Sequence, residues 1–270
     1  MNKVRRVERI AALTKLLTDM PGRLFSLGHF SEVFGAAKST VSEDLVTIKQ
    51  SLQQFGLGTL ETVSGASGGV RFLPYRGKEA ADRLLSDLAF QLEKPERIIP
   101  GGYIYMTDLL FTANLMVPIG EIFMSKFSHL SPDYIMTIET KGIPLALVTA
   151  RAFDLPLVVV RRGGKVTEGP SVSINYVSGS SKRIQTMSLP RRAISAGSKV
   201  LVIDDFMKAG GTAQGMVDLA REVEAEVVGT GVLVATADPE EKLVEDYLAL
   251  LILYGVDQHT KKTDIRPAAL

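Results

Sequence analysis

The sequence predicts an α/β protein of two domains, an N-terminal winged helix-turn-helix followed by a domain with a mainly parallel sheet. The length of 270 residues suits two domains. Residues 1–76 are basic, with ten Lys or Arg against six Asp or Glu. Further along, short β-rich apolar runs alternate with helical stretches, a pattern typical of parallel sheets covered on both faces. We expect the domains to cover residues 1–74 and 75–270.

The composition excludes several classes of protein and site. Hydrophobic residues make up 46% and charged residues 23% of the chain, so a sizeable core can form. The absence of cysteine rules out disulfides, thiolate catalysis and Cys-ligated metals. Because His29, His129 and His259 are far apart in the sequence, we expect no metal site. No apolar run reaches about 18 residues and no signal-peptide pattern is present, so we expect a soluble cytoplasmic protein without a membrane partner.

The first 55 residues have the pattern of three short helices. Apolar residues at spacings of three and four form one stripe of the first helix, which Pro21-Gly22 stops. This stripe consists of Val4, Val7, Ile10, Leu13 and Leu17. Ser26 is expected to cap a second helix that carries Phe30 and Val33 and ends at Gly35. Thr40 and Glu43 have the spacing of a capping box for the third. Its predicted core positions are Val41, Leu45, Ile48 and Leu52.

Two short helices joined by a tight glycine-containing turn form a helix-turn-helix, whose second helix reads the major groove of DNA. A strand, a glycine-rich turn and a second strand follow within residues 58–72 and complete a winged helix. A three-helix interaction module with a hairpin is the alternative. The basic charge favours duplex DNA as the partner. The expected DNA contacts are Arg5, Arg6, Lys38, Ser39, Thr40, Ser42, Lys49 and Arg71.

The remaining chain is expected to hold strands at residues 134–138, 157–160, 200–203 and 227–234. Helices are expected at residues 78–93, 144–153 and 212–224. The most informative stretch is VLVIDDFMKAGGT, residues 200–212, in which a buried strand leads into two carboxylates, a small loop and a helix.

This stretch has the chemistry of a sugar-phosphate site. Asp204 and Asp205 can accept hydrogen bonds from two adjacent ribose hydroxyls, and the backbone N–H groups of residues 208–212 can hold a phosphate with the help of the helix dipole. Gly210 and Gly211 remove side chains that would block the anion, and Thr212 adds a hydroxyl. The alternative is an ordinary strand-to-helix turn with two solvated acids.

The same stretch resembles the PRPP-binding motif of type I phosphoribosyltransferases, and the resemblance extends over roughly residues 100–255. Residues 139–142, Glu-Thr-Lys-Gly, resemble the loop that meets the pyrophosphate of PRPP, where Gly142 would allow an unusual backbone conformation. Residues 161–192 resemble the hairpin that covers the active site of those enzymes. The resemblance implies effector contacts from Tyr103, Thr140, Lys141, Gly142, Asp204, Asp205, Phe206, Met207, Lys208, Ala209, Gly210, Gly211 and Thr212.

A winged helix in front of this fold resembles the purine operon repressors of Gram-positive bacteria. The matching segments are SEDL at 42–45, GGV at 68–70, KGIPLA at 141–146, KVTEG at 165–169, VSINY at 172–176 and DDFMKAGGT at 204–212. The resemblance implies a homodimeric repressor of purine synthesis and salvage genes, without catalysis and without a required cofactor. It implies PRPP as inducer and guanosine tetraphosphate as a competing ligand that favours repression. Tyr103 either stacks near the ligand base or is a core tyrosine, and nothing is carried over beyond Gly255.

Two other functions use the same motifs. An active purine phosphoribosyltransferase with a DNA-binding appendage would keep the acidic pair and the phosphate loop. Such an enzyme also needs a base-reading hood, which is hard to identify in the sequence. An RNA-binding antiterminator of pyrimidine genes shares the fold but lacks a winged helix. The winged helix, which an enzyme does not need, favours the DNA-binding sensor.

Overall fold

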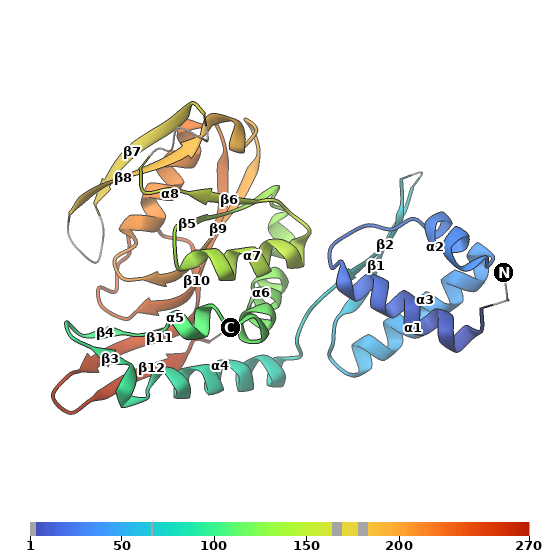
Figure 1. Cartoon of the computed structure of the whole chain (residues 1–270), viewed down its shortest axis with the longest axis horizontal. Coiled ribbons are helices and arrows are strands. Elements are labelled where there is room, and N and C mark those ends of the chain that lie inside the picture. Colours follow the sequence, from blue (N-terminus) through green and yellow to red (C-terminus); the bar gives the residue numbers. More distant parts are fainter. Residues whose placement is uncertain (1–3, 66, 164–168, 178–182, 270) are drawn as a thin grey trace.

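The computed structural model describes residues 4–65, 67–163, 169–177 and 183–269. Figure 1 shows a small N-terminal part, blue to cyan, joined by one crossing of the chain to a larger part that contains the main sheet. In the described ranges, no helix is long and apolar enough to cross a lipid bilayer.

The N-terminal part is the expected winged helix. It consists of α1 (Arg6–Asp19), α2 (Leu27–Phe34), α3 (Lys38–Gln54) and the antiparallel hairpin of β1 (Thr59–Val63) and β2 (Gly69–Leu73). The Ser26 side chain accepts a hydrogen bond from the His29 N–H and so caps α2, and Gly35 ends that helix in the left-handed conformation. The apolar stripes of α1 and α3 meet in one core with the hairpin. Its buried members are Leu13, Leu17, Phe25, Phe30, Val41, Leu45, Ile48, Leu52, Leu60, Val70 and Phe72.

Two details of the winged helix differ from the expectations. Val7, an expected member of the apolar stripe of α1, is 78% exposed. Arg9, two residues further along, is only 7% exposed, because its guanidinium binds a buried carboxylate on α3. The capping box of Thr40 and Glu43 does not form. α3 begins earlier, at Lys38, with the extended residue Ala37 as its N-cap, so that Thr40 is already inside the helix.

The larger part is built on a six-stranded sheet of order β12-β11-β10-β9-β5-β6. Its strands are β5 (Tyr134–Ile138), β6 (Leu157–Val160), β9 (Lys199–Met207), β10 (Glu226–Thr236), β11 (Tyr247–Asp257) and β12 (Lys262–Pro267). All neighbours are parallel except β12, which runs antiparallel to β11 at one edge. The predicted α/β class with a mainly parallel sheet is therefore confirmed.

Helices cover both faces of this sheet. α6 (Ala113–Phe127) and α7 (Gly142–Phe153) share a core with Leu201 and Ile203 of β9, whereas α8 (Gly211–Glu222) shares a second core with Val200 and Val202. This alternation along one strand is what a sheet buried on both sides requires. α4 (Lys78–Leu92) packs on β12. Two antiparallel hairpins lie outside the main sheet, β3 (Ile98–Ile99) with β4 (Tyr103–Ile104) and β7 (Ser171–Val177) with β8 (Ile184–Pro190). The remaining elements are the short helix α5 (Thr107–Leu110) and single helical turns at Pro95–Arg97, Ser128–Leu130 and Arg191–Ala193.

The strand before the acidic pair is longer than expected. β9 continues to Met207, because Asp204, Phe206 and Met207 keep their pairing with β10. The two acids are therefore strand residues rather than loop residues, and the loop before α8 is reduced to residues 208–210. β11 and β12 were not among the expected strands.

Candidate nucleic-acid interface and sugar-phosphate site

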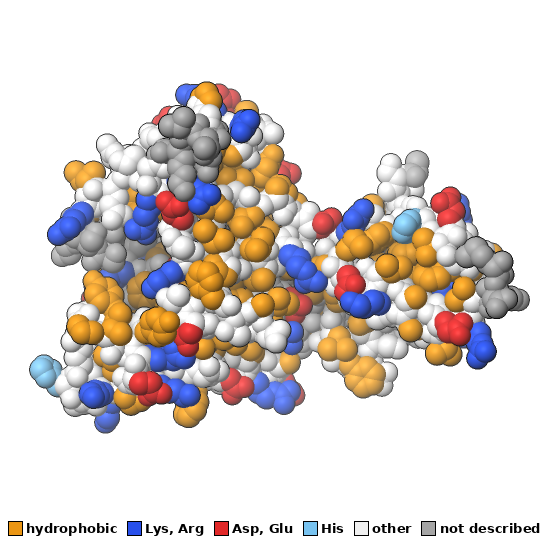
Figure 2. All heavy atoms as spheres, in the orientation of Figure 1, with side chains coloured by type: hydrophobic (Ala, Val, Ile, Leu, Met, Phe, Trp, Pro, Cys, Tyr) orange, Lys and Arg blue, Asp and Glu red, His pale blue; other side chains and the backbone are white. Residues whose placement is uncertain are grey.

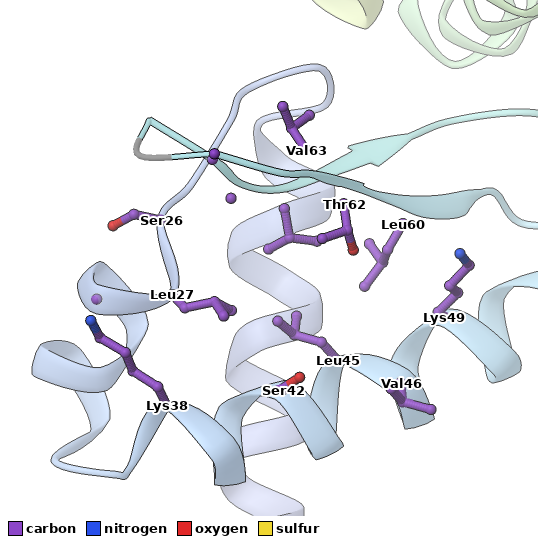
Figure 3. A pocket seen from close by; sticks show the side chains of 15 residues that line it. Ser26, Leu27, Lys38, Ser42, Leu45, Val46, Lys49, Leu60, Thr62 and Val63 are labelled. Atoms are coloured by element: carbon purple, nitrogen blue, oxygen red, sulfur yellow. The ribbon is translucent and has the colours of Figure 1, made fainter.

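A groove of about 560 Å³ lies between the start of α2, the exposed side of α3 and the wing (Figure 3). Lys38, Ser42 and Lys49 reach this groove from α3, at spacings of four and seven residues that place them on one helix face. Lysines stand at its two ends along α3, and the small residues Gly65, Gly68 and Gly69 of the wing leave its other wall open. A groove with lysines at both ends can receive a phosphodiester strand.

The other predicted DNA contacts lie outside this groove. Ser39 is exposed and Thr40 half-buried on α3, but neither lines it. Arg5 is exposed at the start of α1, 3.8 Å from Glu8. Arg71 binds Glu61 directly across the hairpin.

Arg6 and Arg9 both bind Asp44, a buried residue of α3 that the sequence reasoning did not single out. The Arg6 Nε to Asp44 Oδ1 distance is 3.1 Å, and the side chain of Arg6 is 61% exposed, whereas that of Arg9 is buried. These ion pairs hold α1 against α3, the helix whose exposed side lines the groove. The available signal was position, since Asp44 lies three residues after Val41 and on the same side of the helix as the core.

A second cavity, of about 430 Å³, opens where β5 and β9 end, at the carboxyl edge of the sheet. Eight of the predicted effector contacts line it: Thr140, Lys141, Asp204, Asp205, Phe206, Met207, Lys208 and Thr212. Its remaining lining residues are Ile138, Glu139, Arg162, Ala213 and Val232. Ligands of open α/β sheets bind at this edge, so the topology brings residues 139–141 and 204–212 together.

The acidic pair is more buried than a turn of solvated acids would be. Asp204 is 5% exposed, and the backbone N–H of Asp205 donates to its Oδ1 at 3.0 Å. Burial, reinforced by the neighbouring charge of Asp205, raises the pKa of Asp204 well above its ordinary value. Burial also raises the pKa of Asp205, against the opposing charges of Lys141 and Arg162. The pair therefore lines the cavity from a largely buried position.

Gly142 is required for a reason other than the one expected. Its backbone does not adopt a positive φ. A Cβ at this position would overlap the Thr137 hydroxyl and lie 2.8 Å from Asp204 Oδ1, so only glycine lets the start of α7 approach the acid this closely. The Thr137 hydroxyl is buried beside it without a hydrogen-bond partner among the described residues. Gly210, by contrast, does adopt a left-handed conformation, with φ of 81°.

The loop between β9 and α8, residues 208–210, is hydrogen-bonded to a segment that the sequence reasoning missed. The N–H of Leu243 donates to the Ala209 carbonyl at 3.0 Å, and the Thr236 hydroxyl lies 3.2 Å from the Lys208 carbonyl. Lys242 folds this segment, because its Nζ donates to the carbonyls of Thr236, at 2.8 Å, and of Pro239. Desolvation lowers the pKa of Lys242. No motif marks Lys242, which lies 32 residues beyond the end of this loop.

Arg162 is a further cavity residue that the sequence reasoning missed. Glu139 holds it in place, since Glu139 Oε1 accepts from the Arg162 N–H at 2.6 Å and Oε2 accepts from Arg161 Nη1 at 3.2 Å. The sequence could have indicated this residue: Arg161 and Arg162 directly follow β6, and because β6 is parallel to β5, they lie at the same carboxyl edge of the sheet. The expected segments around Lys165 and Ser180, residues 164–168 and 178–182, lie outside the described residues.

Tyr103 does not line the cavity. It lies on β4 and is 56% exposed, so the core-tyrosine alternative is wrong. Its stacking on a ligand base stays a prediction. Gly142, Ala209, Gly210 and Gly211 shape the backbone around the cavity without lining it.

Comparison with known proteins agrees with this two-part architecture. The family model described as bacterial purine repressor, N-terminal, matches residues 5–74, and the phosphoribosyl transferase domain model matches residues 111–254. The purine biosynthesis transcriptional repressor of Bacillus subtilis is 48% identical over 98% of this chain and 93% of its own length. The purine biosynthesis transcriptional activator of Lactococcus lactis is 39% identical over 97% of each chain.

Among solved structures, adenine phosphoribosyltransferase from Saccharomyces cerevisiae has a TM-score of 0.53 at 20% identity, and the match covers 61% of this chain and 97% of that one. This similarity confirms the expected phosphoribosyltransferase fold of the larger part. The full-length matches confirm the resemblance based on the sequence motifs. The chain therefore belongs to the family of bacterial purine biosynthesis transcriptional regulators, in which a purine repressor N-terminal domain precedes a phosphoribosyl transferase domain.

Proposed function

We propose that the chain represses purine biosynthesis and salvage genes, that PRPP weakens its binding to operator DNA, and that guanosine tetraphosphate opposes PRPP. One observation carries the proposal: a single chain combines a lysine-flanked groove on a winged helix with a sugar-phosphate cavity in a separate part. We propose residues 1–74 as the DNA-binding domain and residues 75–270 as the effector-binding domain.

The DNA side rests on charge and shape. The N-terminal residues of α3 enter the major groove, and the wing follows the adjacent backbone. A phosphodiester strand then lies in the groove between them, where Lys38 and Lys49 neutralise phosphates. Ser42 lies between the two lysines and is placed to donate to a phosphate or a base edge.

The effector side follows the chemistry of PRPP. The carboxylates of Asp204 and Asp205 accept from the ribose diol, and the N–H groups at the start of α8 bind the 5′-phosphate. Lys141 and Arg162 neutralise the pyrophosphate from the other side of the cavity. Guanosine tetraphosphate offers paired phosphates as well, and so competes for the same cations.

A ligand changes DNA affinity only if it binds the DNA-competent and DNA-incompetent states differently. A coupling of about 1–3 kcal/mol, or roughly 5- to 150-fold in affinity, is ordinary for such systems. We expect PRPP to weaken operator binding within this range and guanosine tetraphosphate to restore it.

The sign of regulation needs its own test, because a relative named as a repressor and one named as an activator both match this chain along nearly its whole length. The higher identity to the repressor favours repression. Deleting the gene in its host should raise transcription of purine biosynthesis genes. A fall in transcription would mean that the chain activates them.

We propose that the protein is not an enzyme, and that it binds DNA as a homodimer. The alternative is an active purine phosphoribosyltransferase, which the acidic pair and phosphate loop alone would also suit. Purified protein given PRPP, magnesium and adenine, guanine, hypoxanthine or xanthine should release no pyrophosphate above background. Turnover of about 1 per second with any base would support the enzyme.

The decisive experiment measures binding of a purine-gene promoter fragment with and without PRPP. Full-length protein should bind it, and residues 75–270 alone should not, while both should bind PRPP equally. Undiminished DNA binding by the truncated protein would refute the winged-helix interface. Light scattering of the protein, free and on the fragment, tests the dimer.

A further inference from the structure

One helix, α7, lies between the end of β5 and the winged helix (Figure 1). The loop before it, residues 139–141, lines the cavity. Its C-terminal end contacts the turn between α1 and α2. With 12 residues, α7 is about 18 Å long at 1.5 Å per residue. A continuously hydrogen-bonded helix of this length moves as one body.

The contact at the C-terminal end of α7 is close. Gly22, with φ of 80°, lies against the helix end so tightly that a Cβ there would be 2.7 Å from the backbone carbon and oxygen of Phe153. The same Cβ would be 2.9 Å from the Cβ of Asp154. Arg151 Nη2 donates to the Asp19 carbonyl, at the end of α1, at 3.3 Å. Figure 2 shows a narrow waist between the two parts, bordered by basic and acidic side chains.

The turn that receives this contact is hydrogen-bonded into the DNA-reading elements. The N–H of Gly22 donates to the Phe72 carbonyl of β2 at 2.8 Å. Phe25 exchanges two backbone hydrogen bonds with Val70 of the same strand, at 2.9 and 2.8 Å. Ser26, the next residue, caps α2 and lines the groove. A displacement of the turn therefore displaces the wing and the wall of the groove with it.

The N-terminal end of α7 is held as closely as its C-terminal end. Gly142 packs on Asp204 and Thr137 without room for a side chain, so a ligand that engages Asp204 and residues 139–141 acts directly on the start of the helix. Between the two ends, Leu145, Ala146 and Ala150 are buried in the main core. Two glycines without room for a Cβ thus mark the two ends of one rigid element.

We propose that α7 is the mechanical link between the two sites, and that the contact of residues 151–154 with the α1–α2 turn transmits effector binding to the winged helix. This inference rests on the proposed function. An effector that pulls on residues 139–141 shifts α7 along or about its axis, and the turn, locked to Phe153 and Asp154, follows. The competing route is the covalent connection, where Arg76 Nε lies 3.0 Å from Glu121 of α6.

The test uses full-length protein with Gly22→Ala and Arg151→Ala, each with a matched control. Gly197→Ala introduces the same methyl at a left-handed glycine, with φ of 76°, that has nothing within 4 Å. Arg221→Ala likewise removes an exposed arginine from the last turn of a helix, α8. Operator affinity is measured with and without saturating PRPP, PRPP affinity with and without operator DNA, and the Tm of every variant.

We expect Gly22→Ala to bring the PRPP effect on operator affinity to within about twofold of none, and Arg151→Ala to reduce it by about threefold or more. Affinity for PRPP alone should stay within about twofold of wild type, and the reciprocal effect of DNA on PRPP should shrink equally. Both controls should keep the wild-type effect. If Gly22→Ala fails to fold, Arg151→Ala still tests the contact, because it removes only an exposed side chain.

If PRPP weakens operator binding in the wild type, and weakens it equally in Gly22→Ala and Arg151→Ala, the inference is overturned. So would a response that survives both changes and disappears in Arg76→Ala, since the link would then be the covalent connection. A wild-type protein whose operator affinity ignores PRPP would instead overturn the proposed function, before any variant is compared.

Discussion

Replacing Asp44 with alanine should strongly destabilise the winged helix and leave the larger domain intact. The change removes the only carboxylate among the described residues within 4.0 Å of the buried Arg9 guanidinium. Breaking a buried ion pair by removing one partner costs about 3–5 kcal/mol, because it strands the other charge. A domain of 70 residues, the length matched by the repressor family model, has about 4–10 kcal/mol of stability in total at 0.05–0.15 kcal/mol per residue. The expected loss is thus a large share of the whole.

Two matched variants isolate the cause. Arg6→Ala removes the mostly exposed partner of Asp44 and should cost no more than about 1 kcal/mol. Arg9→Met combined with Asp44→Leu removes both charges and should be nearly neutral, since a buried pair replaced by apolar residues is often no less stable.

Urea unfolding followed by circular dichroism, together with limited proteolysis, should show the N-terminal transition moved to lower urea in Asp44→Ala alone. The same variant should bind the operator more weakly and keep PRPP binding. A loss of less than about 1 kcal/mol in Asp44→Ala would refute the buried clamp as a main source of stability in this domain.

Three further outcomes test the sites. Asp204→Asn should abolish the PRPP response yet raise the free energy of unfolding at neutral pH. Burial raises the pKa of Asp204, so the stability of the wild type falls as the pH rises from the ordinary pKa of 3.8 through the pKa in the folded state. Urea titrations at several pH values should show a smaller fall in stability for the variant. Lys38→Ala and Lys49→Ala should each weaken operator binding and lower the log–log salt slope by about 0.9, measured by fluorescence anisotropy, whereas Lys15→Ala, on α1 outside the groove, should change neither. Lys242→Met should weaken PRPP binding in calorimetry while operator binding without PRPP stays unchanged, and equal PRPP affinity would show that the phosphate loop does not depend on this lysine.

The elements marked by local patterns could be predicted from the sequence. The strands at residues 134–138 and 157–160 match the structure at both ends, because each is a short apolar run bounded on both sides by a charged residue or a proline. The core stripe of α3 was likewise correct in all four of its members. In the candidate sugar-phosphate site, residues 200–212 combine a buried strand, two acids and a Gly-Gly-Thr loop, which is unusual for an ordinary turn.

What failed depends on contacts between distant segments. The strand before α8 continues through Asp204 because β10 pairs with it, and no local preference of two acids for a strand announces that pairing. Arg9 is buried because it pairs with Asp44 on another helix, so the charge of Arg9 alone wrongly indicates an exposed position. Gly142 was singled out correctly for the wrong reason, since the crowding by Thr137 and Asp204 exists only in the folded chain.

The antiparallel strand β12 has a consequence for how the chain is made. It covers one edge of the sheet and packs against α4, the helix that immediately follows the winged helix. During synthesis the winged helix is complete before α4 leaves the ribosome, whereas α4 must wait for β12, made some 170 residues later. Domains fold as units as they emerge. The nascent chain can therefore present a folded winged helix for much of its synthesis, while the larger part still lacks the strand that closes its sheet.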